Sequence, residues 1–167
     1  MNLPPALGGA ALTAWRLTKS TYARTWDDGE GAYLVGGRWN SKGVRAVYCS
    51  LDAATATLEL AVHMGFPALD MVPHTMTVLE IPNVADVHIV QDVDVPNPNW
   101  LVPSTPSAGQ QAFGDALLAA HKFVTIPSAV SRGSWNLIFT PAQAAGAYVL
   151  KSQRPYALDP RLHPPQR

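Results

Sequence analysis

The chain has 167 residues, of which 47% are hydrophobic and 14% are charged, and its 12 Lys and Arg are balanced by 12 Asp and Glu. This length fits one domain that can bury a sizeable core. The net charge is zero, so the chain lacks the excess of basic residues that is typical of nucleic-acid-binding proteins. We therefore expect no direct contact with DNA or RNA. A surface so poor in charge is suited to being covered partly by partner proteins.

Cysteine and histidine usage argues against a disulfide and a metal centre. The single cysteine, Cys49, has no partner for an internal disulfide, and the five histidines lack the spacing of zinc ligands. No apolar run approaches the length of a membrane span, and no basic segment precedes the apolar residues at the start of the chain. We therefore expect a cytoplasmic protein with no metal, no membrane segment and no secretory signal.

Hydrophobic periodicity predicts short strands mixed with two helices. In chain order the sequence predicts a strand at 14–18, a glycine-rich segment at 29–40, a strand at 44–50, a helix at 51–64, strands at 75–81 and 87–90, a proline-rich loop at 92–106, a helix at 107–120, and strands at 123–130, 135–139 and 148–150. An irregular lead-in precedes the first strand, and residues 151–167 are rich in Pro, Arg and Gln. We expect those last residues to form a tail or an arm that packs on a neighbour.

The helix expected at 107–120 has a capping-box pattern at its start, formed by Ser107 and Gln110. Its apolar stripe predicts a core helix with no chemistry of its own. Asn99 and Trp100 are the expected anchors of the loop that precedes it.

Unusual chemistry is concentrated between Gly29 and Asn40. Four glycines within nine residues allow backbone conformations and close approaches that other residues resist, and Arg38 and Trp39 follow them directly. A fixed cation beside accessible backbone N–H groups suits a phosphate or a pyrophosphate. A tight Gly-Gly turn followed by a solvent-facing arginine is the alternative, and spacing alone favours it because short glycine motifs often match by accident.

Three further polar residues stand out, and each has two interpretations. Glu59 lies in a helix otherwise made of Ala, Thr and Leu; it is either a solvated carboxylate or one that points into a cleft beside Arg38. Ser128 follows Pro127 near the end of a strand, where active-site residues often lie, but an ordinary rim serine also fits. Arg16 either reaches a cleft from its strand or lies on the surface.

Taken in order, these residues resemble the RES domain family, which is named for its Arg, Glu and Ser and supplies the toxins of Xre-RES toxin–antitoxin modules. The resemblance runs from about Ala14 to about Pro141, and its most specific parts are Gly-Gly-Arg-Trp-Asn at 36–40 and the spacing from Tyr48 to Glu59. It implies a single α+β domain over 1–167, with a core at about 14–150 and a tail at 151–167. The implied architecture is similar to that of ADP-ribosyltransferase toxins, with a central mixed sheet, flanking helices and a cleft for NAD.

The resemblance also implies a function in which NAD is a substrate and no cofactor is needed. By position, Arg38, Tyr48 and Glu59 match the catalytic residues of the family. The implied NAD-binding residues are Arg16, Gly37, Trp39, Asn40, Ser128 and Asn136. A carboxylate such as Glu59 would stabilise the positive charge that develops on the ribose when the nicotinamide–ribose bond breaks.

The family supports more than one reaction and more than one partner. Growth arrest by phosphorolysis or hydrolysis of NAD is the leading expectation, and transfer of ADP-ribose to a protein acceptor is the alternative. The implied partners are an Xre-type antitoxin that covers the active site and a second copy in a homodimer. A partner-binding module without catalysis is the hypothesis from a different class. The chain has no GxGxxG unit between a strand and a helix, which agrees with NAD being consumed and not used as a redox carrier.

Overall fold

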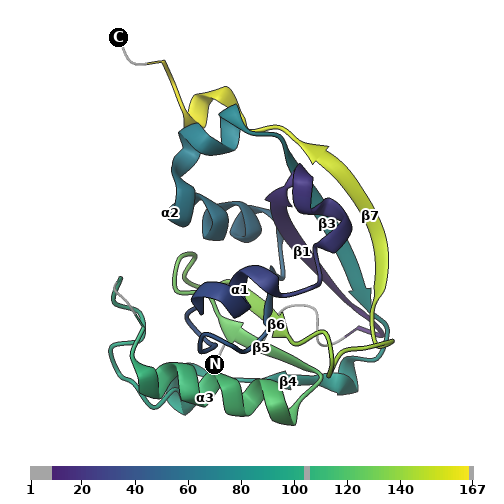
Figure 1. Cartoon of the computed structure of the whole chain (residues 1–167), viewed down its shortest axis with the longest axis vertical. Helices are drawn as coiled ribbons and strands as arrows, with labels where there is room; N and C mark the ends of the chain where they lie inside the picture. The colour runs from purple at the N-terminus through teal and green to yellow at the C-terminus, as the bar shows by residue number, and fades with distance from the viewer. Residues whose placement is uncertain (1–8, 104–105, 166–167) are drawn as a thin grey trace.

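A mixed seven-stranded sheet organises the computed structural model, which describes residues 9–103 and 106–165 (Figure 1). The strands lie in the order β4-β5-β6-β2-β1-β3-β7, and every neighbouring pair is antiparallel except β4 with β5. This is the α+β architecture with a mixed sheet that the sequence predicted. Parts of the expected lead-in, loop and tail, at 1–8, 104–105 and 166–167, lie outside the described residues.

The strands are β1 (Leu12–Lys19), β2 (Val47–Ser50), β3 (His74–Ile81), β4 (Val87–Ile89), β5 (Phe123–Pro127), β6 (Trp135–Phe139) and β7 (Val149–Tyr156). The α-helices are α1 (Glu30–Val35), α2 (Ala53–Met71) and α3 (Ala108–Ala120), and the short 3-10 helices are η1 (Ser20–Thr25), η2 (Val84–Asp86), η3 (Asp92–Asp94) and η4 (Pro160–Leu162).

Helices α2 and α3 pack against the same face of the sheet but on different strands. Figure 1 shows α2 beside β1 and α3 beside β4 and β5. Leu118 of α3 packs with Ile126 and Ile138, and the side chain of Glu59 on α2 reaches Asn136. Asn136 and Ile138 are two residues apart on β6, so their side chains share a face. The middle strands thus lie between the two helices on this face, and they form the floor of the candidate active site.

The opposite face of the sheet carries the larger apolar cluster. Leu12, Val47 and Phe139 belong to this cluster and are fully buried there. Trp26 and Tyr148 pack edge to face over them, with ring centroids 5.8 Å apart. This cluster fixes the central strands, because it buries apolar side chains of β1, β2 and β6 on one face of the sheet.

Helix α2 is longer than the expected 51–64. At Gly65 the backbone leaves the helical region (φ 77°, ψ 155°), and the helix then resumes as far as Met71. Pro67 is tolerated because it lies in the first turn of the resumed segment, where its missing N–H has no helical partner to lose. The Gly-x-Pro pattern therefore produces a kink in the helix and does not end it.

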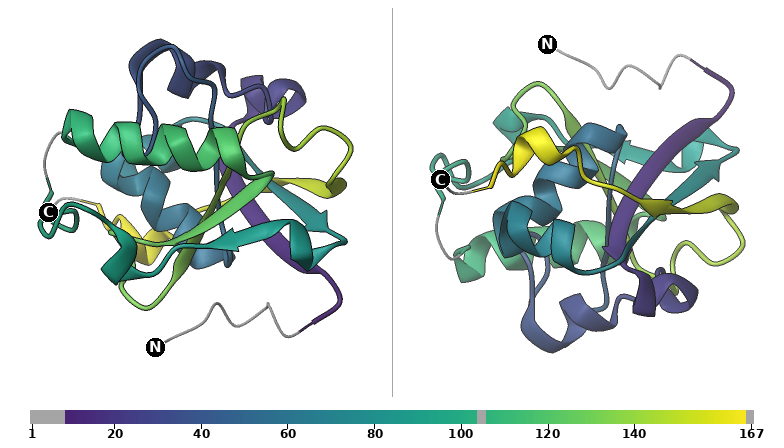
Figure 2. Two further views of the ribbon diagram at one scale, coloured as in Figure 1. Left: turned by 90° about the horizontal axis from the view of Figure 1, so that it is seen from below. Right: turned by 90° about the horizontal axis from the view of Figure 1, so that it is seen from above.

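The expected tail after Lys151 is wrong as far as Tyr156, because these residues form most of β7, the edge strand beside β3. The strand is almost entirely exposed, so it lacks the alternation by which strands are recognised. Pro155 is compatible with an edge position, since no further strand requires its N–H. Beyond β7 the chain returns to α2, where Leu158 packs with Leu69 (Figure 2).

Candidate active site

The carboxylate of Glu59 is held by two neutral donors from the sheet. Its Oε1 accepts hydrogen bonds from Ser128 Oγ at 2.7 Å and from Asn136 Nδ2 at 2.5 Å. Ser50 Oγ donates in turn to Asn136 Oδ1 at 2.8 Å, which fixes the orientation of that amide. Both bonds to Glu59 fall on Oε1, so within the described part of the chain Oε2 has no protein partner.

Local structure explains why Glu59 points at the sheet. Asp52 caps α2 by accepting from the Thr55 N–H and from Thr55 Oγ1, both at 2.7 Å. This start sets the phase of the helix, so that Glu59 faces the strands while Leu58 lies exposed. The kink at Gly65 comes after this turn and leaves it undisturbed.

Ser128 reaches Glu59 because β5 ends at Pro127, three residues before the expected end of the strand. A proline donates no ladder hydrogen bond, and the chain turns directly after it. The hydroxyl of Ser128 organises this turn by accepting from the N–H groups of Val130 (3.2 Å) and Ser131 (2.9 Å). With its own proton it donates to Glu59, so this serine both builds the turn and holds the carboxylate.

The hydroxyl of Tyr48 ties down the arginine turn, as we name residues 36–41. It accepts from the Trp39 N–H at 3.1 Å and donates to Asn40 Oδ1 at 2.6 Å. A Cβ on Gly37 would lie 2.6 Å from this hydroxyl oxygen, so only glycine fits there. The helix α1 that precedes the turn begins after Gly29 and ends at Gly36, both with positive φ.

Helix α3 supports the arginine turn from the other side, although the sequence suggested a helix without a role in the site. Gln111 Nε2 donates to the Gly37 carbonyl at 2.9 Å, and Asp115 Oδ1 accepts from the Ser41 N–H at 2.9 Å. A Cβ on Gly114 would come within 1.9 Å of a carbonyl oxygen of the turn. These residues were missed because their partners are backbone atoms some seventy positions earlier in the chain; Gln111 lies 74 residues from Gly37.

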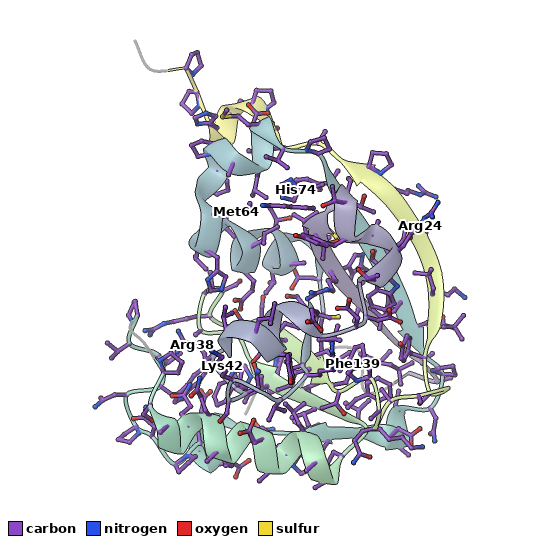
Figure 3. The ribbon with its side chains drawn as sticks, viewed as in Figure 1. Arg24, Arg38, Lys42, Met64, His74 and Phe139 are labelled. Atoms are coloured by element: carbon purple, nitrogen blue, oxygen red, sulfur yellow. The ribbon has the colours of Figure 1, made fainter. Side chains whose placement is uncertain are left out.

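Arg38 projects from this turn with its side chain partly exposed. Its Nη1 donates to the Trp100 carbonyl at 2.6 Å, and no acidic side chain of residues 9–103 or 106–165 forms an ion pair with it. Trp100 is 4% exposed, so it anchors the loop at 92–106 that precedes α3, as expected. Figure 3 labels Arg38 on the side of the molecule where α1 and α3 meet that loop. The guanidinium is therefore oriented by a neutral carbonyl and keeps its full charge for a ligand.

The charges of Arg38 and Glu59 both act on the hydroxyl of Tyr48. Burial is the largest effect and raises the pKa of Tyr48. The hydrogen bond from the Trp39 N–H lowers this pKa, and the charge of Asp115 raises it. Arg38 and Glu59 have smaller effects: Arg38 lowers the pKa and Glu59 raises it. The raised pKa agrees with the hydrogen bond that the Tyr48 hydroxyl donates to Asn40 Oδ1. The position of this hydroxyl links the two charged groups across the floor of the site.

The strand register gives the spacing between these groups. Tyr48 pairs with Ile138, and Ser50 pairs with Asn136. These two pairs are two residues apart on β2, or about 7 Å along the strand. Glu59 lies over the pair of Ser50 and Asn136, and Arg38 belongs to the turn that Tyr48 holds over the other pair. The sheet therefore offers an anionic position and a cationic position side by side.

Trp39 and Asn40 lie beneath the surface of the site. Trp39 is 2% exposed, and its ring lies 5.6 Å from that of Trp100 between centroids. Asn40 is fully buried, and its Nδ2 donates to three backbone carbonyls between Ala32 and Val44. Both residues shape the arginine turn, and direct contact with NAD stays a prediction for each.

The structure does not bring Arg16 to the Glu59 cluster. The pairing of Trp15 with Ser50 places Arg16 beside Cys49, on the opposite face of the sheet. Burial there lowers the pKa of Arg16, and Nη1 donates to the Tyr48 carbonyl at 2.6 Å. Arg16 thus supports the strand that carries Tyr48, and this geometry does not favour its expected contact with NAD.

Two absences hold for the residues the structure describes. In this part of the chain no helix is long and apolar enough to cross a membrane. In the same residues no group of three or more His, Cys, Asp or Glu side chains is arranged to hold a metal ion.

The fold and this site define an α+β domain that holds a carboxylate and a guanidinium over neighbouring parts of a mixed sheet, each without an ion-pair partner among the residues the structure describes. The chain belongs to the RES domain family, whose model matches residues 13–159. It is 30% identical over 152 residues to a protein named Toxin Res from Photorhabdus laumondii, covering 89% of this chain and 95% of that one.

Two further relatives complete the comparison. A protein named Prs ADP-ribosylating toxin, from a Sphingobium species, is 28% identical over 159 residues, covering 89% of this chain and 94% of that one. The fold is also similar to the M. tuberculosis MbcT-MbcA toxin-antitoxin complex, with a TM-score of 0.69 at 18% identity over 88% of this chain and 85% of the other. That identity is low, so this last likeness concerns the fold alone.

Proposed function

We propose that this protein is the toxin of a toxin–antitoxin pair and that it consumes NAD by breaking the bond between nicotinamide and ribose. One observation carries the proposal: Glu59 holds its carboxylate over the sheet with two neutral donors and, among residues 9–103 and 106–165, no cationic partner, next to the turn that presents Arg38. Family membership and relatives that are named toxins support the same conclusion.

The role of Glu59 follows from the charge that develops in the reaction. As the nicotinamide leaves, positive charge builds on the ribose, and a nearby carboxylate lowers the energy of that transition state. Ser128 and Asn136 orient Glu59 through hydrogen bonds but do not neutralise it, as a lysine or an arginine would. Its second oxygen, Oε2, is the one available to the sugar.

Arg38 and Tyr48 serve binding and positioning. The guanidinium matches the oxygens of a pyrophosphate, and its carbonyl partner leaves most of its donors available. Tyr48 holds the backbone beside Arg38, so it acts as a positioning residue. Binding at the pyrophosphate would hold the scissile bond against Glu59 and so convert binding energy into orientation.

Three acceptors are compatible with this site: water, inorganic phosphate and a protein side chain. The first two would give free ADP-ribose or its 1-phosphate. The third would make the protein a mono-ADP-ribosyltransferase, and the relative named Prs ADP-ribosylating toxin favours that alternative. All three reactions share the step at Glu59, so they are distinguished by their products.

The experiment is to incubate the purified protein with NAD, with and without phosphate and cell lysate, and to identify the products by mass spectrometry. Replacing Glu59 by Gln keeps the hydrogen-bonding shape but removes the charge, and we expect a loss of about 100-fold or more in kcat. Glu80→Gln is the matched control, because Glu80 forms only a surface ion pair with Lys151 at 3.4 Å. If NAD persists under every condition, the partner-binding hypothesis replaces this one.

An antitoxin is the proposed partner, in line with the toxin–antitoxin complex that shares this fold. Apolar side chains exposed beside the site support it: Leu58 and Val62 flank Glu59 on α2, and Val35 of α1 is 80% exposed. Such residues suit a covering protein more than open solvent. Co-purification of the wild-type chain with the antitoxin, compared with a Leu58→Asp, Val62→Asp variant, tests this surface. The expected homodimer stays a prediction.

A further inference from the structure

A cavity of about 380 Å³ opens beside Arg38, between the arginine turn and the loop that precedes α3. It is lined by Arg38, Asn97, Asn99, Trp100, Val102 and Gln110, among others. Among its described lining residues Arg38 is the one charged group. The cavity is far larger than a phosphate ion needs and lies within the range of sites for small ligands.

Besides Arg38 and Ser107, the polar side chains that line this cavity are amides, and hydrogen bonds hold two of them in place. Gln110 is 1% exposed; its Oε1 accepts from Asn97 Nδ2 at 3.1 Å, and Asn97 Oδ1 accepts from the Asn99 N–H at 3.0 Å. Amide side chains carry both donors and acceptors, as the edge of a nucleobase does. Val102 and Trp100 contribute apolar surface for the faces of a ring.

The cavity lies on the same side of the sheet as Glu59. Trp100 packs in the cluster that contains Ile126 and Ile138, and this cluster covers the face from which Asn136 reaches Glu59. Moving from Glu59 to Arg38 and on into the cavity, a ligand meets an anion, then a cation, then neutral amides. That order matches a molecule with a developing cation, a pyrophosphate and a neutral nucleoside.

We infer that this cavity binds the adenosine half of NAD, with Arg38 on the pyrophosphate at its entrance. The inference rests on the proposed function for its choice of NAD, and it adds the part of the substrate that sets specificity. Recognition then depends on the adenosine half, so nicotinamide mononucleotide, which keeps the scissile bond but lacks that half, is a poor substrate. Free AMP competes with NAD.

The test fills the cavity and compares the two substrates. Val102 is 52% exposed, so Val102→Trp adds bulk at the cavity wall without burying a new side chain in the core. We expect the preference for NAD over nicotinamide mononucleotide, as a ratio of kcat/KM, to fall about tenfold, mainly through a higher KM for NAD. Val149→Trp is the matched control, since Val149 is 48% exposed on the edge strand β7.

Calorimetry of AMP with the Glu59→Gln protein supplies a second readout that needs no turnover. AMP binding that Val102→Trp weakens and Val149→Trp does not would support the inference. If NAD is consumed while Val102→Trp leaves its KM unchanged, or if only inorganic phosphate binds, the adenosine site is refuted and the proposed function stands. If AMP binds but NAD is never consumed, the proposed function fails and the nucleotide site remains.

Discussion

Replacing Tyr48 by Phe tests whether this residue works through the arginine turn. The change removes one hydroxyl and leaves two buried partners, the Trp39 N–H and Asn40 Oδ1, without their bonds of 3.1 and 2.6 Å. An unsatisfied buried polar group costs about 1–3 kcal/mol, so the loss of two bonds should lower the free energy of unfolding by roughly 2–6 kcal/mol. For a chain of this length that lowers Tm by roughly 4–24 °C.

The assay for Tyr48→Phe is thermal unfolding followed by circular dichroism, with NAD consumption measured well below the lowered Tm. Tyr22→Phe is the matched control, because Tyr22 is 59% exposed and its loss should leave Tm unchanged. We expect reduced but measurable activity, since the hydroxyl acts by holding the turn. Complete loss of activity at an unchanged Tm would refute this reasoning and place the hydroxyl on the substrate.

Three further predictions follow from buried or crowded groups. Gly114→Ala should unfold or strongly destabilise the protein, since its Cβ would lie 1.9 Å from a carbonyl oxygen. Gly109→Ala, whose Cβ would meet only Ser107 Oγ at 4.0 Å, should be tolerated in a urea titration. Burial raises the pKa of Cys49 to about 12, so a thiol reagent at pH 8 should label it only after denaturation, and stability should decline as pH rises from about 8.5 towards 12. Burial, and then the charge of His121, lower the pKa of His88. Stability is therefore full above about pH 6.5 and declines below it, and His88→Gln should flatten that decline in urea titrations at several pH values.

Elements with a buried face could be predicted from the sequence, and exposed or locally irregular ones could not. The strands β1, β3 and β6 show the alternation or apolar run that burial requires, and the cap of α3 is present as expected, with Ser107 Oγ accepting from the Gln110 N–H at 3.1 Å. Only the start of strand β7, at 148–150, was predicted; the rest was missed because only its pairing with β3 defines it. Helix α1 was missed because its six residues are too few to show a period.

The same contrast applies to the site. The family resemblance implied a shared NAD cleft for Arg38, Glu59 and Ser128, and in the structure Ser128 donates a hydrogen bond to Glu59 across 69 residues of sequence. Periodicity alone favoured a solvated glutamate, because helical phase does not reveal what lies opposite a side chain. The amides of α3 could not be predicted, since backbone carbonyls as partners leave no pattern in the sequence.

The unpaired charges of the site lead to a last prediction about ligand-linked stability. If Arg38 and Glu59 formed an ion pair, their fields would largely cancel; instead a carbonyl orients one and two neutral donors orient the other. A pyrophosphate at Arg38 would then supply the missing counter-charge, so Glu59→Gln protein, which we expect to bind NAD and to cleave it at least about 100-fold more slowly, should be stabilised by NAD. At 100 times Kd the gain is about 2.7 kcal/mol, or roughly 5–10 °C in Tm. Adding Arg38→Gln should abolish the shift, while adding Arg154→Gln on the exposed strand β7 should preserve it. An equal shift in both double variants would mean that NAD stabilises the fold from somewhere other than Arg38.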